Sequence, residues 1–347
     1  MTDKTKKSEK KKPATSKKKE KAQQREIEKR NAVMLAFNKY YEEEWGSERW
    51  PVLLEALQKP VRHCMMINKY ANIQELKAKL EPTLSDLTML DFLRIPCYAS
   101  KSHSRFPAPS KDSAGVTDYY ILDAGSVLAT EALDIQPEDH VLDICAAPGG
   151  KTLSILQRLD AKYGQLTSNE IASDRRRRLR QVIESYIPAN IAAELSTVVG
   201  KDGTKYYGEP EQYDKVLLDA PCSSERHVLH DEKEFEIWTP KRTQMNAKRQ
   251  LALLKAAVHS VRVGGLVLYG TCSISSLEND KVIEKMIKKG KIPVEPVKQK
   301  WPVGEKTKYG WIMLPDKTEG WGPLYFALLK RTGASKEEED SEDEEDE

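Results

Sequence analysis

The chain has 347 residues, of which 39% are hydrophobic and 32% are charged, and its formal net charge is +2. This length predicts a substantial core divided between one large domain and a smaller one. The five widely spaced cysteines form no C-x-x-C pair, and no apolar run reaches about eighteen residues, which argues against a disulfide framework, a metal site and a membrane span.

The two ends of the chain are far more charged than its middle. Residues 1–30 hold eleven Lys and two Arg against five acidic residues, and residues 337–347 hold ten acidic residues and one serine. Because neither end has enough apolar surface to offset its ordering entropy, we predict disordered tails over 1–30 and 333–347. The N-terminal lysines indicate RNA contact or a nuclear, nucleolar or cytosolic protein, and they differ from an Arg-rich mitochondrial presequence.

Residues 31–109 are predicted to form a helical region followed by a linker. An apolar stripe near Met34 to Tyr41 indicates one helix, residues 52–57 a second, and Ile73 to Leu80 a third. Lysines and arginines give these helices a basic outer face, so we interpret the region as RNA-binding. Ser and Pro residues over 96–117 indicate the linker into the next domain.

Over residues 110–332 the strand and helix patterns alternate. Repeated βα units predict an α/β fold in which helices cover both faces of a parallel sheet. The last apolar segment, 324–329, is predicted to be an antiparallel edge strand. The expected strands lie at 140–145, 165–170, 196–200, 215–219 and 266–271, and the expected helices at 123–133, 175–186, 243–261 and 279–289.

A glycine turn follows the first expected strand. The sequence from Val141 to Thr152 runs from an apolar strand through Cys-Ala-Ala-Pro-Gly-Gly into a helix, which presents free backbone N–H groups to a carboxylate or phosphate. The G-x-G-x-x-G pattern of nicotinamide-binding turns is absent, and a P-loop requires glycine where Cys145 stands. S-adenosylmethionine is the third cofactor class that uses such a turn, together with an acidic residue on the next strand.

Two later strands end in a cysteine. One reads Asp219-Ala-Pro-Cys222-Ser and the other Tyr269-Gly-Thr-Cys272-Ser. Ligands bind beyond the carboxyl ends of the strands in parallel sheets, so both cysteines are expected at the same rim as the glycine turn. A single buried cysteine is usually inert packing, but two in matching positions indicate thiol chemistry.

These segments resemble, in the same order, the motifs of the Sun (Fmu-type) RNA cytosine-5 methyltransferases. The resemblance lies in residues 145–151, 219–224 and 271–273, and further segments at 118–123, 222–227 and 322–326 are similar to compact animal members that act on mitochondrial RNA. It implies a Rossmann-like class I S-adenosylmethionine-dependent methyltransferase sheet, an RNA substrate with rRNA favoured over tRNA, a possible protein partner, and the mitochondrial matrix as an alternative location.

The resemblance also implies roles for individual residues. Cys272 would attack carbon 6 of cytosine, Cys222 would assist release of the methylated base, and Asp219 would hydrogen-bond the base and stabilise the adduct. Glu170 would hold the ribose and Asp202 the adenine amine. The complete cofactor-binding set implied is Cys145, Ala146, Ala147, Pro148, Gly149, Gly150, Lys151, Glu170, Arg175, Asp202 and Asp219, with no metal.

Several alternatives remain open at this point. DNA cytosine-5 methyltransferases attack with the cysteine of their Pro-Cys motif, which here is Cys222. A methyltransferase fold could also serve as a catalytically silent RNA-binding assembly factor in ribosome formation, although the intact motifs argue against it. A small-molecule methyltransferase would not explain the paired cysteines. Finally, Arg226, His227 and His230 are candidates for a phosphate contact beside a flipped base.

Overall fold

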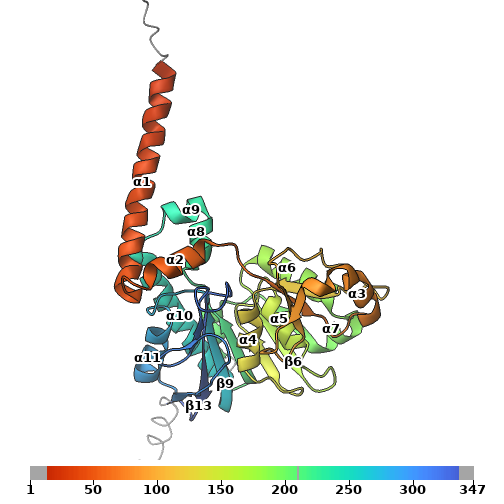
Figure 1. Ribbon diagram of the computed structural model, residues 1–347. Coiled ribbons are helices and arrows are strands. Elements are labelled where there is room, and N and C mark those ends of the chain that lie inside the picture. Colours follow the sequence, from red (N-terminus) through yellow and green to blue (C-terminus); the bar gives the residue numbers. More distant parts are fainter. Residues whose placement is uncertain (1–13, 209–210, 336–347) are drawn as a thin grey trace, which may run out of the picture.

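The first helix is long, and its last turns pack into the core through Phe37 and Tyr41. The computed structural model describes residues 14–208 and 211–335, and helix α1 (Ala14–Trp45) projects from the body (Figure 1). The prediction of disorder is therefore wrong for residues 14–30, where Lys, Glu, Gln and Ala all favour a helix. Residues 1–13 of the expected N-terminal tail and residues 336–347 of the acidic tail lie outside the described residues.

The region after α1 is only partly helical. Helices α2 (Trp50–Gln58) and α3 (Ile73–Leu80) are present, but a four-stranded antiparallel sheet accompanies them. Its strand order is β2 (Leu87–Met89), β3 (Cys97–Ser100), β1 (Cys64–Ile67) and β4 (Tyr119–Leu122). The purely helical prediction for 31–109 is thus wrong, because periodicity cannot distinguish a short buried apolar run such as β1 from part of a helix. The N-terminal module also extends past residue 109, because β4 pairs with β1.

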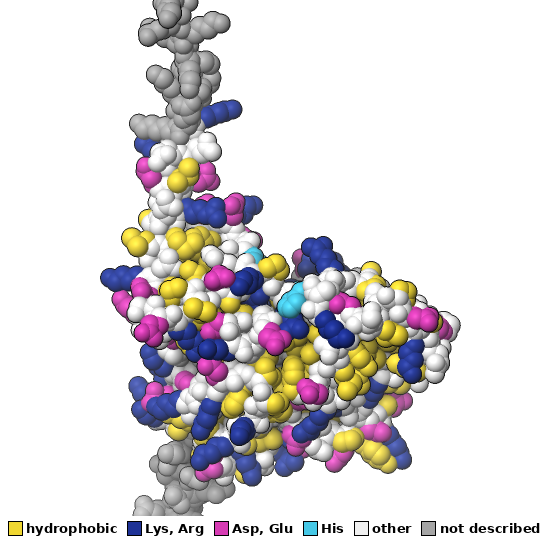
Figure 2. Space-filling model, viewed as in Figure 1, with side chains coloured by type: hydrophobic (Ala, Val, Ile, Leu, Met, Phe, Trp, Pro, Cys, Tyr) yellow, Lys and Arg dark blue, Asp and Glu magenta, His cyan; other side chains and the backbone are white. Residues whose placement is uncertain are grey.

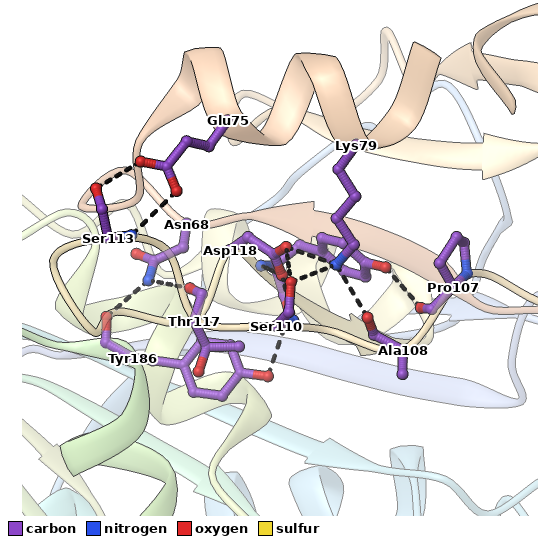
Figure 3. Close-up of polar contacts among 11 residues, drawn as sticks. Asn68, Glu75, Lys79, Pro107, Ala108, Ser110, Ser113, Thr117, Asp118 and Tyr186 are labelled. Carbon is purple, nitrogen blue, oxygen red and sulfur yellow. Dashed lines mark hydrogen bonds and ion pairs between the residues drawn. The ribbon is translucent and has the colours of Figure 1, made fainter. Parts of the chain in front are cut away.

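The expected linker is fastened to its surroundings. The Asp118 carboxylate accepts from Lys79 Nζ at 2.7 Å, and the same ammonium donates to Ala108 O at 2.9 Å (Figure 3). Asn68 Nδ2 donates to the carbonyl of Thr117 at 2.8 Å and to that of Tyr186 at 2.7 Å. The segment 107–118 therefore joins α3 to the large domain through specific polar contacts.

The large domain contains the second sheet. Its order is β11 (Glu305–Lys306), β12 (Trp311–Met313), β13 (Leu324–Arg331), β9 (Val261–Thr271), β8 (Tyr213–Asp219), β5 (His140–Asp143), β6 (Gln165–Asn169) and β7 (Ser196–Val199), with β10 (Val294–Pro296) also paired to β13. Strands β5 to β9 pair in parallel with one another, which confirms the expected α/β sheet, whereas β9 pairs antiparallel with β13. The edge position predicted for 324–329 is wrong, because β13 lies between β9 and β12.

Alternate residues of the central strands feed two cores. Leu142 and Leu218 pack on one face of the sheet, and Val141 and Leu217 on the other, as expected for side chains that alternate along a strand. Helices α10 (Pro240–Ser260) and α11 (Asp280–Lys289) cover the first face, and α4 (Ala124–Ala132), α5 (Gly150–Leu156) and α6 (Ser173–Tyr186) the second (Figure 1). The remaining helical segments are η1 (Glu81–Asp86), α7 (Ala189–Leu195), η2 (Gly203–Gly208), α8 (Glu225–His230) and α9 (Glu232–Glu236).

This arrangement places the carboxyl ends of β5, β6, β7, β8 and β9 along one rim of the sheet. The glycine turn and both cysteine loops leave the sheet at this rim. Within the described residues, no helix combines the length and apolar character needed to cross a bilayer.

Candidate active site

The two cysteine loops meet at the rim. Strands β8 and β9 are parallel neighbours in which Asp219 lies opposite Gly270, so the loops that follow them start side by side. The sulfur atoms of Cys222 and Cys272 are 3.1 Å apart, and Ser224 Oγ lies 3.0 Å from the Cys272 sulfur and 3.3 Å from the Cys222 sulfur. All five cysteines are free. The sequence therefore identified the pair correctly but missed Ser224, whose only signal was its place in the Cys-Ser-Ser segment.

A partly buried ion pair, Lys151 with Asp219, lies beside the sulfurs. Lys151 Nζ in the first turn of α5 donates to Asp219 Oδ2 at 2.7 Å and to Ser126 Oγ at 3.2 Å. The hydrogen bond with Cys222, helped by Ser224 and the Lys151 charge, lowers the pKa of Cys272 against the opposing effects of burial and Asp219. The same sulfur–sulfur contact, followed by burial, raises the pKa of Cys222. Cys272 is therefore the more acidic thiol of the pair.

The charge of Lys151 gives a testable pH dependence. A thiolate is the species that reacts with iodoacetamide, so the alkylation rate of Cys272 rises with pH and levels off above the thiol pKa. Lys151→Met removes a cation that lowers this pKa, and we expect the acid limb of the profile to move up by about one pH unit. Mass spectrometry of the Cys272 peptide measures the rate. Lys162→Met, at an exposed lysine over Tyr163, serves as the control. Superimposable profiles for Lys151→Met and the unmodified protein would contradict this assignment.

The glycine turn leads into a cavity that the cysteines also line. Gly149 is the N-cap residue just before α5 and has φ +117°, a left-handed conformation that disfavours other residues, and a Cβ there would lie 3.1 Å from Val182. The cavity has a volume of about 300 Å³. Six of the predicted cofactor residues line it together with Cys222 and Cys272: Cys145, Ala147, Glu170, Arg175, Asp202 and Asp219.

A second cavity adjoins the first. It has a volume of about 200 Å³ and shares Cys145, Ala147 and Asp219 with its neighbour. The predicted residues Ala146, Pro148, Gly150 and Lys151 line this second cavity. The predicted set therefore surrounds two connected hollows, while Gly149 shapes the turn between them.

The carboxylates of the larger cavity are held in place. Glu170 follows β6 and is buried, its Oε1 accepts from Ala172 N at 2.9 Å, and its Oε2 lies 3.4 Å from Arg175 Nε. Arg175 also donates to the carbonyl of Ala147 at 2.7 Å, which ties α6 to the glycine turn. Asp202 accepts from the backbone and hydroxyl of Thr204. Acids beyond two successive strands thus face one cavity.

The sequence matches a family of RNA methyltransferases. The family model described as 16S rRNA methyltransferase RsmB/F matches residues 130–330. The chain belongs to this family. It is 35% identical over 264 residues to the 5-cytosine rRNA methyltransferase NSUN4 of Xenopus tropicalis, covering 71% of this chain and 64% of that protein. It is 31% identical over 328 residues to the mitochondrial tRNA (cytosine(34)-C(5))-methyltransferase of Danio rerio, covering 86% and 87%.

Solved structures agree on the fold of this RsmB/F family member. NSun6 from Pyrococcus horikoshii, solved with SFG, superposes with a TM-score of 0.71 at 20% identity and covers 86% of this chain and 98% of that one. The predicted Rossmann-like class I methyltransferase fold is confirmed. The chain is an S-adenosylmethionine-dependent RNA cytosine-5 methyltransferase. The larger cavity fits this cofactor chemically, because buried Glu170 offers an acceptor for hydroxyls and Ile144 and Leu253 offer an apolar wall.

No metal is indicated by the geometry: among residues 14–208 and 211–335, no three His, Cys, Asp or Glu side chains are grouped as metal ligands.

The expected phosphate contact at Arg226 is wrong. Arg226 is 5% exposed, and its guanidinium donates to the carbonyls of Gly320, Gly322, Lys59 and Pro60. His230 likewise contacts the Leu57 carbonyl at 3.0 Å. The position of Arg226 close to Cys222 in the sequence suggested a contact with the substrate. In the structure its buried guanidinium instead connects α8 to the segment after α2 and to the loop before β13.

Arg226→Ala is expected to affect stability far more than direct RNA contact. The variant leaves several buried carbonyl groups without a donor, and each such group costs about 1–3 kcal/mol. We expect the free energy of unfolding to fall by about 3 kcal/mol or more, measured by urea denaturation. His227→Ala, at the exposed neighbour on the same helix, is the matched control. Unchanged stability combined with weakened RNA binding would favour the phosphate role instead.

Proposed function

We propose that this enzyme methylates carbon 5 of cytosine in rRNA through a covalent bond between Cys272 and carbon 6 of the base. The observation that supports this most directly is the group formed by the two sulfurs 3.1 Å apart and the Lys151–Asp219 pair beside them. Carbon 5 of cytosine is a poor nucleophile, and addition of a thiolate to carbon 6 gives it enamine character.

Each residue of the group has one task in this proposal. The Cys272 thiolate forms the S–C6 bond, and Asp219 hydrogen-bonds the ring nitrogen or the exocyclic amine while Lys151 holds its carboxylate in place. S-adenosylmethionine, when bound, supplies the methyl group for carbon 5. Cys222 loses its proton to solvent once the S–C6 bond has formed, and its thiolate accepts the proton from carbon 5. The C5–C6 double bond re-forms, and Cys272 leaves as a thiolate.

The charge balance of the pair supports this order. While Cys272 is a thiolate, its contact raises the pKa of Cys222 and keeps the second thiol protonated. Bond formation to carbon 6 removes the Cys272 charge and with it the main reason for that raised pKa. Cys222 can therefore ionise, and so act as a base, at the stage at which a base is required.

The cofactor residues are assigned within the same proposal. The backbone of 145–151 surrounds the methionine moiety, Glu170 accepts from the ribose hydroxyls, and Asp202 accepts from the adenine amine. Arg175 fixes Glu170 and the glycine turn through the contacts described above. The positions of these groups around one cavity support the assignment.

We propose that RNA reaches the cysteines along a large groove. A cavity of about 1410 Å³ lies among α2, the loop 100–106 and the segment 315–320. Its basic lining residues are Lys59, Arg62, His63, His103 and Arg105. Figure 2 shows Lys, Arg and His side chains around an apolar hollow near the centre of the view. Ile121 lines both this groove and the cavity that contains Lys151 and Asp219, so the two adjoin.

The groove is electrostatically suited to a polyanion. Its three acids are each paired with a base, Glu55 with Lys59, Asp316 with Arg49 and Glu319 with Arg62, so the basic lining residues not paired with a lining acid are His63, His103 and Arg105. His63, His103 and Arg105 are exposed. The side chain of Phe106 on the same loop offers an apolar surface for an unstacked base, consistent with a looped or single-stranded RNA. This gives the module before the catalytic domain its proposed RNA-binding role.

Arg105→Ala tests the groove. Loss of one phosphate contact is expected to weaken binding of all RNAs similarly and to reduce the slope of log Kd against log salt by about 1. Fluorescence anisotropy over a range of NaCl concentrations gives this slope. Arg177→Ala, at an exposed arginine of α6 paired with Asp174, is the control and should keep the parent slope. Equal slopes for the two variants would show that RNA does not bind along the groove at Arg105.

An assay of methyl transfer separates rRNA from tRNA. The names of the relatives include both substrates, and the similarity around Cys222 and β13 favours rRNA. Purified enzyme, labelled S-adenosylmethionine and transcripts of small-subunit rRNA or tRNA should give label chiefly in the rRNA, with bisulfite sequencing to locate the cytosine. Label only in tRNA would overturn the rRNA assignment. RNA binding without label in either transcript would favour the assembly-factor role.

The location and a protein partner are part of the same proposal. The name of the Danio rerio relative supports the mitochondrion, whereas the lysines of residues 1–30 support the nucleus or nucleolus. Imaging of the full chain with a C-terminal tag distinguishes these compartments.

The proposed groove supplies RNA contacts within the chain. We therefore propose that a protein partner adds target selection rather than basic RNA affinity. Pull-down experiments with and without RNA test this proposal.

A further inference from the structure

A buried carboxylate behind the cysteines joins three segments of the chain. Glu225, at the start of α8, is completely buried. Its Oε1 accepts from the Tyr41 hydroxyl at 2.6 Å and from Ser273 Oγ at 3.0 Å, and Ser223 Oγ donates to the same oxygen. Its Oε2 accepts from the backbone of Ile274 at 3.0 Å. One side chain thus connects α1, the loop after β8 and the loop after β9.

The contacts of Glu225 fall next to the reacting residues. Ser223 and Ser273 directly follow Cys222 and Cys272, and their hydroxyl oxygens are 3.0 Å apart. The two loops are therefore tied to each other one residue away from each sulfur. Glu225 itself is not among the residues that line the cavity of the cysteines, so any effect on the reaction passes through the loops.

A second buried carboxylate supports one of these loops. Glu278 Oε2 accepts from the backbone of Ser223 at 3.0 Å and from Gln250 Nε2 at 2.7 Å, and Gln250 also donates to the Pro221 carbonyl at 2.9 Å. Burial, with the nearby charge of Glu225, raises the pKa of Glu278 to about 7. Burying two carboxylates near each other costs free energy, because their charges repel and both lose water. The four hydrogen bonds donated to Glu225 offset part of that cost.

We infer that Glu225 is a positioning residue that holds the loops of Cys222 and Cys272 together and links Tyr41 of helix α1 to them. This inference rests on the proposed roles of the two cysteines, because addition and release at one base require both sulfurs within reach of it. A carboxylate suits this position, because all four groups that contact Glu225 are hydrogen-bond donors. The amide of a glutamine would instead place its own NH₂ donor against one of them.

A trivalent arsenical provides a probe of the sulfur spacing that needs neither RNA nor cofactor. Phenylarsine oxide reacts with two neighbouring thiols, forming two As–S bonds and releasing one water, with no change in oxidation state. Cys64 and Cys97 form another close pair in the N-terminal sheet. All variants are therefore made in a Cys97→Ala parent, and mass spectrometry of the digested protein distinguishes a bridge between Cys222 and Cys272 from one that involves Cys145, which lines the same cavity.

The expected result is a loss of bridging when the tie is removed. Glu225→Ala should slow arsenical bridging at least about tenfold, because misplacement of reacting atoms by about 1 Å has effects of this size or larger. Glu225→Gln and Tyr41→Phe should give smaller losses in the same direction, and Cys222→Ser should abolish bridging. Mass spectrometry counts the bound arsenic, and thermal melting reports whether each variant is folded.

Glu131→Gln is the matched control. Glu131 is also buried, and its carboxylate accepts from the backbones of Arg94 and Ile95, remote from the cysteine loops. The control should bridge at the parent rate even if it melts earlier. Parent-rate bridging in folded Glu225→Gln and Tyr41→Phe overturns the inference, as does an equal loss in Glu131→Gln.

Single-turnover methylation then separates this inference from the proposed function. Glu225→Gln should lower the rate at saturating RNA at least about tenfold while leaving the Kd for RNA within about twofold. If the parent enzyme itself transfers no methyl group, the proposed function fails, whereas the arsenical result still stands. If the parent is active and Glu225→Gln matches it, only the positioning role fails.

Discussion

Cys272→Ala is expected to lower the methylation rate by roughly 10⁴-fold or more and to prevent any covalent bond to RNA. Removal of a nucleophile from a cooperating group has effects of this order, because the remaining groups cannot replace the covalent step. The measurement is single-turnover transfer of labelled methyl groups at saturating RNA, together with denaturing gels that detect a protein–RNA adduct. The lowered pKa of Cys272, to which the charge of Lys151 contributes, is the reason for choosing this sulfur.

The control for Cys272→Ala is Cys64→Ala in the N-terminal sheet. Cys64 is fully buried in strand β1, so its substitution tests whether loss of a thiol alone disturbs the enzyme. We expect Cys64→Ala to keep an active enzyme. A Cys272→Ala enzyme that still forms an adduct, with loss of that adduct in Cys222→Ala, would reverse the two roles and match the order used by DNA cytosine-5 methyltransferases.

The catalytic rim was predictable because its signals are local. Each strand of the parallel sheet is followed by its own helix, and the cysteines come directly after two such strands. Parallel strands end at a common rim, which brought Cys145, Cys222 and Cys272 to one cavity without any knowledge of the strand order. The 3.1 Å separation of the sulfurs was not predictable, since it depends on β8 and β9 being neighbours and on buried contacts behind them.

The errors arose where distant parts of the chain determine the structure. Strand β1 reads like part of a helix, and only its pairing with β3 and β4 makes it a strand. Strand β13 has an interior place because the short β12 covers its outer side. Arg226 looked like a phosphate ligand in sequence, but its carbonyl partners lie about 100 to 170 residues away.

The buried Glu225 illustrates the same limit of sequence analysis. An acidic residue after Cys-Ser-Ser gives no indication in the sequence that it is completely buried, and Tyr41 lies 184 residues from its partner Glu225. Sequence motifs predicted which atoms react, whereas the groups that hold those atoms became visible only through the tertiary contacts. The contacts also explain why α1 is more than an appendage, because its last turns contact both cysteine loops through Tyr41 and Glu44.

Cys222→Ala is expected to accumulate enzyme covalently joined to its RNA. In this variant Cys272 still forms the S–C6 bond, but the group proposed to take the proton from carbon 5 is missing, so the double bond re-forms slowly and the enzyme is not expelled. Loss of a general base typically slows its step by about 10² to 10⁴-fold, so turnover should fall by a similar factor while adduct builds up. Crosslinking in cells that express the variant, followed by sequencing of the attached RNA, identifies the substrate and the cytosine.

The double variant Cys222→Ala/Cys272→Ala makes this result interpretable. If the adduct disappears in the double variant, the bond was to Cys272, and Cys222 acts after that bond has formed. An adduct that persists in the double variant would place the bond on another residue. If Cys222→Ala accumulates no adduct yet loses activity, Cys222 acts before or during addition, and the proton from carbon 5 must go elsewhere. The two sulfurs are in contact, so their positions do not distinguish the nucleophile from the base. The adduct that each variant forms does distinguish them. The order of the two thiols is therefore decided by which single variant remains attached to RNA.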